Sequence, residues 1–451
     1  MTERLVVVGG DAAGMSAASQ ARRRRSPADL AITAYERSSW VSYSACGEPY
    51  HIAGHVDPLE ALVARTPEEF AEMDIGVHIR HEVTTIDTAS RTVTVRSLDD
   101  GAVFDETYDQ LLIATGATAV RPPITGRDLA GVHELRTLDD AAALRAIADE
   151  GPDSVVVVGG GYIGLETAEA FHERGWNVTV VSAHPGVLER GLDPDLGMEV
   201  ADAMRRRGIE VVTETRVRCI LGTDHVEGVE IGDEERPAKA VVLGLGSRPE
   251  VDLAEAAGIP LGPTGAIAVD ATQRTTVDGV WAAGDCAEVM HRVTGRPANI
   301  HLGTVANKTG RVAGINLGGG DATFPGALGT TITRVCDTEV ATVGLRRTEA
   351  VEAGFDAVEG TATGTTTAGY MPEARPMTIR AVAERGTGRL LGAQIVGGEG
   401  SGKRIDVFAT AIWNRMTAAD LEWVDLSYAP PFSGTWDLVA IAAREAKRAA
   451  M

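Results

Sequence analysis

A single cysteine, Cys46, lies in a segment of small residues that could carry thiol chemistry. Residues 41–54 read VSYSACGEPYHIAG. Glycine beside a cysteine lets a bulky partner approach the backbone, and a helix beginning at or just after Cys46 would stabilise its thiolate. Five positions later stands His51, so no local dithiol can form. We expect Cys46 to react with an external sulfur or oxygen atom; the alternative is a small buried apolar residue.

Two glycine-rich turns flank this segment and predict two dinucleotide-binding sites. The first follows the apolar run LVVV and reads GGDAAG over residues 9–14, with Asp11 where a second glycine is usual. The second follows VVVV and reads GGGYIG over residues 159–164, which completes the pattern. A strand before and a helix after such a turn place a pyrophosphate at the helix N-terminus. Glu36 stands about 20 residues beyond the first turn, where a ribose-binding acid is expected.

The composition bounds the class of protein. At 451 residues, with 44% hydrophobic residues, the chain should form two or three domains. The net charge of −22 disfavours nucleic acid and anionic membranes as partners. The four cysteines lack paired spacing and no apolar run is long enough for a signal peptide or a membrane span, so we expect a cytoplasmic protein. The ten histidines show no metal-ligand spacing.

The segment SYSACGEPY resembles the active site of the FAD-dependent pyridine nucleotide-disulfide oxidoreductases that carry a single redox cysteine. This branch holds coenzyme A-disulfide reductases, NADH oxidases, NADH peroxidases and persulfide reductases. The motifs ATG, GDCAEV and YAPPFS, with the two glycine-rich turns, extend the resemblance over nearly the whole chain. It implies an α/β fold like that of glutathione reductase, with two Rossmann-like domains and a C-terminal α+β dimerisation domain. The implied domains are residues 1–118 and 245–326 for FAD, 119–244 for NAD(P)H and 327–451 for the interface.

The resemblance also implies the cofactors, FAD with NADPH or NADH, and the residues that bind them. These residues are Gly9, Asp11, Ala12, Ala13, Gly14, Glu36, Arg37, Ala114, Thr115, Gly116, Gly159, Gly161, Tyr162, Ile163, Gly164, Glu166, Ser182, His184, Arg190, Gly246, Gly284, Asp285, Leu302 and Gly303. Among them, Tyr162 resembles the residue that covers the nicotinamide pocket, and Glu166 the acid that faces the flavin. No acid stands at Ser182, where an NAD enzyme holds the 2′-hydroxyl. This favours NADPH, although an enzyme that accepts both cofactors would have the same pattern.

The substrate site is implied in the same way. SQARR resembles the SQxRR motif whose arginines contact coenzyme A phosphates, which predicts Arg22 and Arg23 as phosphate ligands; the alternative is a favourable charge at a helix C-terminus. Ser42 and Tyr43 are expected beside the substrate. The catalytic residues expected besides Cys46 are Tyr428 and Tyr370, which occupy positions where the family inserts tyrosines into the partner's site, so we expect a homodimer.

Together these features predict an NAD(P)H-dependent flavoprotein reductase of a small disulfide or persulfide, similar to coenzyme A-disulfide reductases. One alternative is an oxidase or peroxidase that cycles Cys46 through sulfenic acid, but such enzymes carry histidine at the position of Ala12. Another is a redox-sensing flavoprotein without turnover. Ala45 and Glu48 depart from the coenzyme A-disulfide reductase pattern, which has asparagine and an apolar residue there. A carboxylate at Glu48 should raise the thiol pKa and repel an anionic substrate.

Overall fold

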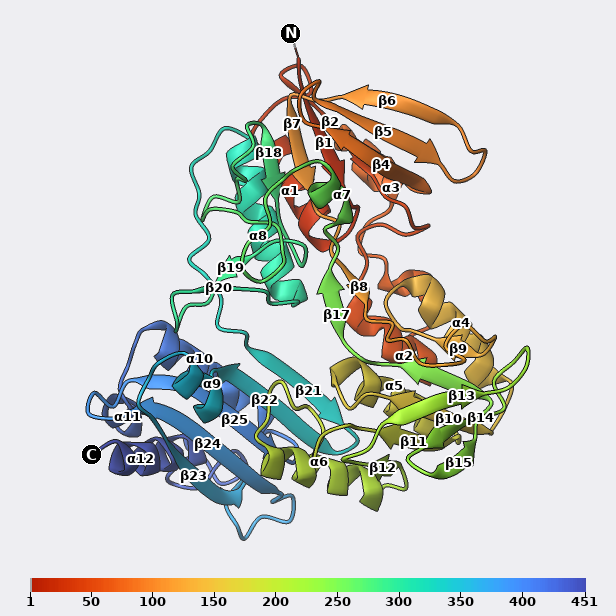
Figure 1. Cartoon of the computed structure of the whole chain (residues 1–451). Helices are drawn as coiled ribbons and strands as arrows, with labels where there is room; N and C mark the ends of the chain where they lie inside the picture. Colours follow the sequence, from red (N-terminus) through yellow and green to blue (C-terminus); the bar gives the residue numbers. More distant parts are fainter. Residues whose placement is uncertain (1) are drawn as a thin grey trace.

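Three five-stranded sheets frame the computed structural model, which describes residues 2–451 (Figure 1). The first sheet is parallel, in the order β18-β7-β1-β2-β3. Its strands are β1 (Glu3–Val8), β2 (Leu30–Tyr35), β3 (Ile75–His78), β7 (Gln110–Ile113) and β18 (Val280–Ala282). The expected apolar run is therefore a strand at the centre of a parallel sheet, where both faces are covered.

Side chains of β1 alternate between two cores on opposite faces of this sheet. Leu5 and Val7 pack with helices α1 (Ala12–Arg22) and α8 (Gly303–Leu317). Val6 and Val8 pack against an antiparallel ribbon of β4 (His81–Asp87), β5 (Thr92–Ser97) and β6 (Val103–Thr107). The two turns that begin α1 and α8 therefore meet at the carboxyl ends of the strands, where α/β sheets bind ligands.

The second sheet repeats this plan. Its order is β12-β11-β10-β16-β9, all parallel, with β9 (Val132–His133), β10 (Ser154–Val158), β11 (Asn177–Val181), β12 (Glu210–Val212) and β16 (Ala240–Leu243). Helices α4 (Leu138–Asp149), α5 (Tyr162–Glu173) and α6 (Pro194–Arg206) share one core with it. Strands β13 (Val217–Leu221), β14 (Gly228–Ile231) and β15 (Glu234–Pro237) cover its other face. The chain leaves the first sheet along β8 (Ala117–Ala119) and returns along β17 (Ser247–Pro249), which pair with each other.

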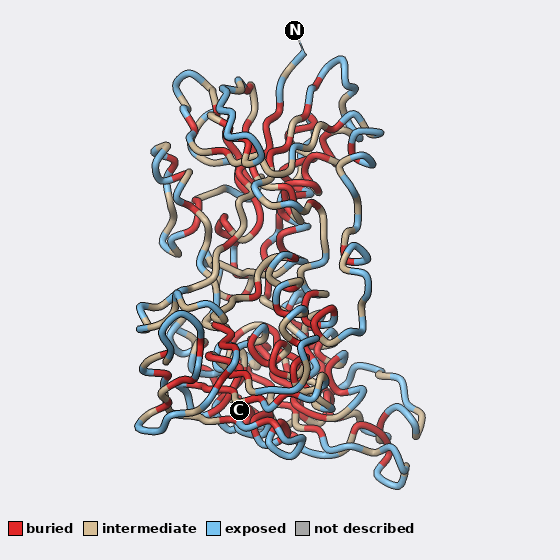
Figure 2. The backbone as a smooth tube through the Cα atoms, turned by 90° about the vertical axis from the view of Figure 1, so that its right-hand side faces the viewer, coloured by how far each residue is buried: buried red, intermediate tan, exposed pale blue. Residues whose placement is uncertain are grey.

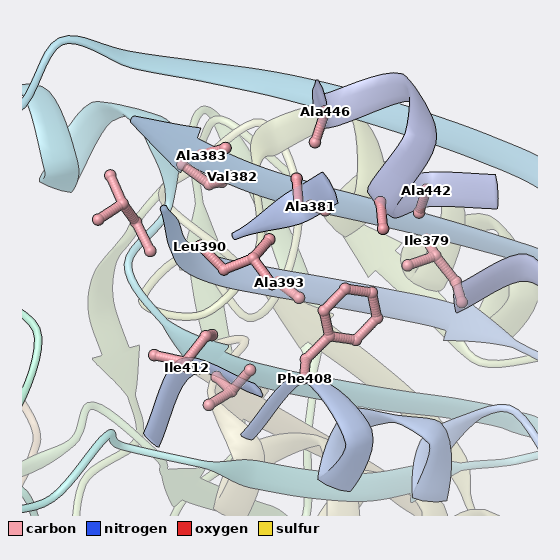
Figure 3. Close-up of a cluster of buried hydrophobic side chains, with 14 of the residues drawn as sticks. Ile379, Ala381, Val382, Ala383, Leu390, Ala393, Phe408, Ile412, Ala442 and Ala446 are labelled. Atoms are coloured by element: carbon pink, nitrogen blue, oxygen red, sulfur yellow. The ribbon is translucent and has the colours of Figure 1, made fainter. Parts of the chain in front are cut away.

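The third sheet is antiparallel, in the order β21-β22-β25-β24-β23. Its strands are β21 (Thr331–Val335), β22 (Thr338–Gly344), β23 (Ala357–Thr365), β24 (Pro376–Glu384) and β25 (Leu390–Gly397). Helices α10 (Ile405–Trp413) and α12 (Leu438–Ala450) share one core with this sheet, and Figure 3 shows Phe408 and Ile412 of α10 and Ala442 and Ala446 of α12 among the buried side chains.

The remaining elements are short connections. They are α3 (Pro67–Ala71), α7 (Asp252–Ala256), α9 (Arg347–Glu352), α11 (Ala418–Glu422), β19 (Val289–Met290) and β20 (Pro297–Ala298). Buried residues gather in the upper and lower parts of the molecule, and the chain between them is largely intermediate or exposed (Figure 2). No helix in residues 2–451 is both long and apolar enough to cross a membrane. The topology confirms the expected fold class, while the residue boundaries of the domains stay predictions.

Candidate active site

One large cleft runs between the three sheets and holds most of the expected site. Its volume is about 2230 Å³, whereas a pocket for one small ligand usually has about 300–1,000 Å³. Of the expected cofactor residues, all line this cleft except Gly14 and Gly164. Cys46 and Tyr43 line it as well. The cleft therefore has room for two dinucleotides and a substrate around one thiol.

The two glycine-rich turns are built alike. Gly9 and Gly159 have φ of 109° and 116°, a conformation that favours glycine. A Cβ on Gly9 would lie 2.7 Å from the carbonyl carbon of Ala114, and one on Gly159 equally close to that of Gly244. Because they lack a Cβ, Gly9 lets its turn pack directly against the chain just after β7, and Gly159 lets its turn pack against the chain just after β16. Gly14 and Gly164 instead pack against the carbonyl groups of Gly9 and Gly159, so they bring helix and strand together and do not face a ligand.

Glu36 is held at the end of β2, beside the first turn. Its carboxylate accepts hydrogen bonds from the backbone N–H groups of Gly10 and Ser38, both at 2.8 Å. A carboxylate has about four acceptor positions, so others remain for ribose hydroxyl groups. Arg37 lies at the rim, 4.0 Å from Glu250. This arrangement suits the adenosine end of a dinucleotide.

The cysteine segment is fastened to the same turn. The N–H of Ser42 donates to the carbonyl of Gly10 (2.9 Å), and the N–H of Tyr43 donates to Asp11 Oδ1 (3.1 Å). Cys46 then lies in a short 3-10 turn, Ala45–Gly47, directly before helix α2 (Glu48–Ala53). Asp11, at the position of the missing glycine, thus positions the chain that carries the thiol. The sequence analysis expected Asp11 to bind the cofactor and missed this positioning role.

The surroundings of Cys46 oppose its ionisation. The residue is exposed to solvent, yet the thiol pKa is raised, mainly by burial of the sulfur and then by Glu166, Glu48 and Asp11. The helix was predicted to begin just after Cys46, and it does. A stabilising contribution of this six-residue helix to the thiolate stays a prediction, while the three carboxyl groups act against ionisation. The expectation that Glu48 raises the thiol pKa is confirmed.

The third sheet contributes two hydroxyl groups to the cleft. Thr333 on β21 donates to Glu166 Oε1 at 2.6 Å, and the Tyr162 hydroxyl lies 2.7 Å from Thr331 Oγ1. Both partners are on α5, so β21 fixes the residues of the second dinucleotide site that face the first. Burial raises the pKa of Glu166, and the bond from Thr333 opposes that rise. No local sequence pattern points to these threonines, which lie 167 and 169 positions from their partners.

The opposite wall begins at helix α8. Leu302 caps this helix and Gly303 starts it, and both line the cleft. Arg136 Nη2 lies 3.3 Å from Asp285 Oδ2, and His301 Nδ1 lies 2.6 Å from the hydroxyl of Ser247.

His301 Nε2 and Glu48 Oε1 are buried polar atoms of cleft residues that have no hydrogen-bond partner within residues 2–451. Buried polar atoms are normally paired, so these two are suited to bind a polar ligand. The helix N-terminus at Gly303 and the free side chains fit an electron-accepting flavin ring. The donor set of this wall therefore agrees with FAD.

The second dinucleotide site differs in detail from the expectation. The Ser182 hydroxyl donates to the carbonyl of Gly186 at 2.9 Å and accepts from the N–H of His184. Ser182 is therefore occupied within its own turn. His184 pairs with Glu189. Arg190 lies close to Gly246, since a Cβ added to Gly246 would be 3.8 Å from Arg190 Nη1. Arg216 also lines this part of the cleft; sequence reasoning missed it because it follows a separate strand, β12.

The two arginines expected to bind phosphate lie outside the cleft. The Arg22 guanidinium donates to the carbonyl groups of Leu30 (2.7 Å) and Asp74 (3.0 Å), which favours the alternative of a structural role at the end of α1. Burial lowers the pKa of Arg22. Arg23 is exposed on the surface. A role in phosphate binding stays a prediction for Arg23 and is disfavoured for Arg22 by these bonds.

The two tyrosines also lie outside the cleft of their own chain. Tyr370 is 75% exposed and Tyr428 is 49% exposed. Their loops are tied together, because the N–H of Ala368 donates to the carbonyl of Pro430 at 2.9 Å. Arg404 donates to carbonyl groups of both loops. The tyrosines are thus presented together on the outside of the third sheet, as residues that act on a partner subunit would be.

Comparisons with known proteins agree with this geometry. Residues 3–309 match the family model of the pyridine nucleotide-disulphide oxidoreductases, and residues 330–440 match the dimerisation domain of the same family. The chain is 37% identical over 445 residues to the NAD(P)H sulfur oxidoreductase (CoA-dependent) of Pyrococcus abyssi, covering 98% of each chain. It is 34% identical over 445 residues to the NADH oxidase of Methanocaldococcus jannaschii, again covering 98% of both.

Among solved structures, the NAD-dependent persulfide reductase from A. fulgidus superposes with a TM-score of 0.94 at 38% identity. The superposition covers 99% of this chain and 83% of that one. Two matched family models span most of the chain, and the relatives match it nearly end to end. The chain therefore belongs to the pyridine nucleotide-disulphide oxidoreductases.

Proposed function

We propose that this protein is an NAD(P)H-dependent flavoprotein reductase that cleaves a small disulfide or persulfide through Cys46. The observation that carries the proposal is one solvent-accessible thiol in a cleft lined by two dinucleotide-binding turns. The other three cysteines are free, and none of them lines this cleft. Cys46 must therefore exchange sulfur with a molecule that enters from outside.

The overall reaction converts NADPH, a proton and a disulfide RSSR into NADP⁺ and two thiols RSH. The Cys46 thiolate attacks RSSR, which forms the mixed disulfide Cys46–S–S–R and releases RS⁻. Two electrons and one proton then break the mixed disulfide into the Cys46 thiolate and RSH. FAD, when bound, supplies the relay of these two electrons from NAD(P)H. The chain's own residues hold the thiol in place and set its surroundings: Asp11 anchors its segment, and Glu166 acts on it from α5.

Four finer features belong to the same proposal. Coenzyme A is the preferred thiol carrier, as the name of the Pyrococcus abyssi relative suggests. NADPH serves at least as well as NADH, because His184, Arg190 and Arg216 line the second site. The enzyme works in the cytosol, because all four cysteines are free. The active form is a homodimer in which Tyr428 and Tyr370 reach the partner's thiol, where a hydroxyl can protonate the leaving thiolate.

The experiment is turnover of NADPH with coenzyme A disulfide by purified holoenzyme. Cys46→Ser should keep FAD and its reduction by NADPH but lose disulfide reduction by orders of magnitude, because an alcohol cannot replace the thiolate in exchange. Cys336→Ser is the control, since Cys336 lies at the β21–β22 turn outside the cleft. Full turnover by Cys46→Ser with disulfides and persulfides would refute the proposal. If oxygen instead supports fast turnover through Cys46, the oxidase alternative holds.

A further inference from the structure

Glu48 stands two residues after Cys46, and its environment is unusual for a carboxyl group. Only 4% of the residue is exposed, and its carboxyl lines the cleft. Oε1 has no hydrogen-bond partner within residues 2–451. Side chains of Glu are almost never fully buried without a partner, because leaving such a group unpaired costs stability. The chain therefore keeps a costly group beside its reactive thiol.

The charged groups that act on Glu48 come from α4, from the loop before α4 and from the first glycine-rich turn. Helix α2 packs against α4 and α5. From the start of α4, Asp140 opposes ionisation of Glu48, as does Asp11 from the first glycine-rich turn. Arg136, in the loop before α4, favours ionisation, but it is engaged with Asp285. Burial is the largest influence, and together these groups raise the pKa of Glu48 to about 8.

Carboxyl groups also act on Cys46. Glu166 from α5, Glu48 and Asp11 each oppose the thiolate. With a pKa of about 8, Glu48 loses its proton as the pH rises above neutral, whereas Asp11, with a pKa of about 6, is already largely ionised there. A proton on Glu48 removes one negative charge from the surroundings of the sulfur, and loss of that proton restores it.

We propose that Glu48 is a positioning residue that controls when Cys46 ionises: a neutral Glu48 permits the thiolate, and a charged Glu48 opposes it. The inference rests on the proposed role of Cys46 as the sulfur-exchanging group. It adds that the pH response of the thiol is set by a neighbouring carboxyl group. A chain with an apolar residue at this position would have a more acidic and more reactive thiol.

The test measures the thiolate directly and needs no turnover. Purified holoenzyme, reduced and freed of thiol, is treated with iodoacetamide between pH 6 and 10, and alkylation of the peptide that contains Cys46 is followed by mass spectrometry. Glu48→Gln keeps the shape of the side chain and removes its charge. Glu48→Met is a second variant with an apolar side chain of similar length. Glu60→Gln is the matched control, because Glu60 lies in the same segment and is exposed.

We expect both Glu48 variants to lower the alkylation midpoint by about half to one pH unit, which is a roughly three- to tenfold higher rate at pH 8. Glu60→Gln should leave the profile unchanged. A Glu48→Gln profile that superposes on the wild-type profile would overturn the inference, as would an equal shift in Glu60→Gln. If Glu48→Gln does not fold, the Glu48→Met profile decides by the same criterion. Turnover with coenzyme A disulfide tests the proposed function separately, so the two proposals can fail independently.

Discussion

The burial of Glu48 predicts that the protein loses stability as the pH rises, and that Glu48→Gln prevents part of this loss. The pKa of Glu48 rises from 4.5 to about 8 on folding. A group whose pKa is raised by folding stabilises the folded state fully at pH values below its pKa in the unfolded chain. This stabilisation is lost as the pH rises through its pKa in the folded state. The loss should therefore develop between about pH 4.5 and pH 8 and level off above pH 8.

The size of the effect follows from the pKa change. Ionising Glu48 in the folded state costs at most about 5 kcal/mol, and entry of water or movement of the helix should reduce this to about 2–4 kcal/mol. A glutamine has no charge to bury. The free energy of unfolding of Glu48→Gln should therefore exceed that of the wild type by nearly all of this amount at pH 8.5 and by little at pH 5. At roughly 1 °C per kcal/mol for 451 residues that unfold together, the Tm of the variant should exceed that of the wild type by about 2–4 °C at pH 8.5.

The assay is differential scanning calorimetry of the holoenzyme at several pH values, with equal FAD in all samples because bound ligand shifts Tm. The difference in Tm between Glu48→Gln and wild type is the measured quantity, and the same difference for Glu60→Gln is the control. A difference that stays constant from pH 5 to pH 8.5 would refute the reasoning. So would a variant that is less stable than the wild type at every pH, since the buried carboxyl would then have a compensating partner.

Three further outcomes follow from the structure. Gly310→Ala should destabilise the protein by roughly 1–3 kcal/mol, seen as a lower Tm, because the added Cβ would lie 2.7 Å from Ala13 Cα where α8 meets α1. His184→Ala should lower kcat/KM for NADPH more than for NADH; an equal decrease would exclude a role in cofactor choice. Tyr428→Phe should sediment as a dimer yet reduce disulfides more slowly, and unchanged turnover would remove Tyr428 from the site.

Much of the framework could be predicted because local sequence determines it. The apolar runs that precede the glycine-rich turns form central parallel strands, since only such strands are buried on both faces. The first turn keeps its fold despite Asp11, because Gly9 and Gly14 make the close approaches and the middle position does not. The predicted effect of Glu48 on the thiol was also correct, as the two residues are neighbours in the chain.

Contacts between distant segments could not be predicted in this way. Thr333 and Thr331 reach α5 only because the third sheet packs beside the second, and no local pattern reports that packing. The same applies to Arg22, whose guanidinium is bound by backbone carbonyl groups of Leu30 and Asp74. A motif match at Arg22 gives the residue type but not where its side chain points.

The raised pKa of the Cys46 thiol has opposite effects on the two halves of thiol exchange. At neutral pH a smaller fraction is thiolate, so the attack on an incoming disulfide is slower. The same basicity makes Cys46 a poor leaving group, so a mixed disulfide on Cys46 resists attack by free thiols that would expel it. Electrons delivered within the cleft can still cleave that bond. An acidic wall of Asp11, Glu48 and Glu166 therefore suits an enzyme that retains its captured sulfur until it is reduced, more than one that exchanges thiols freely.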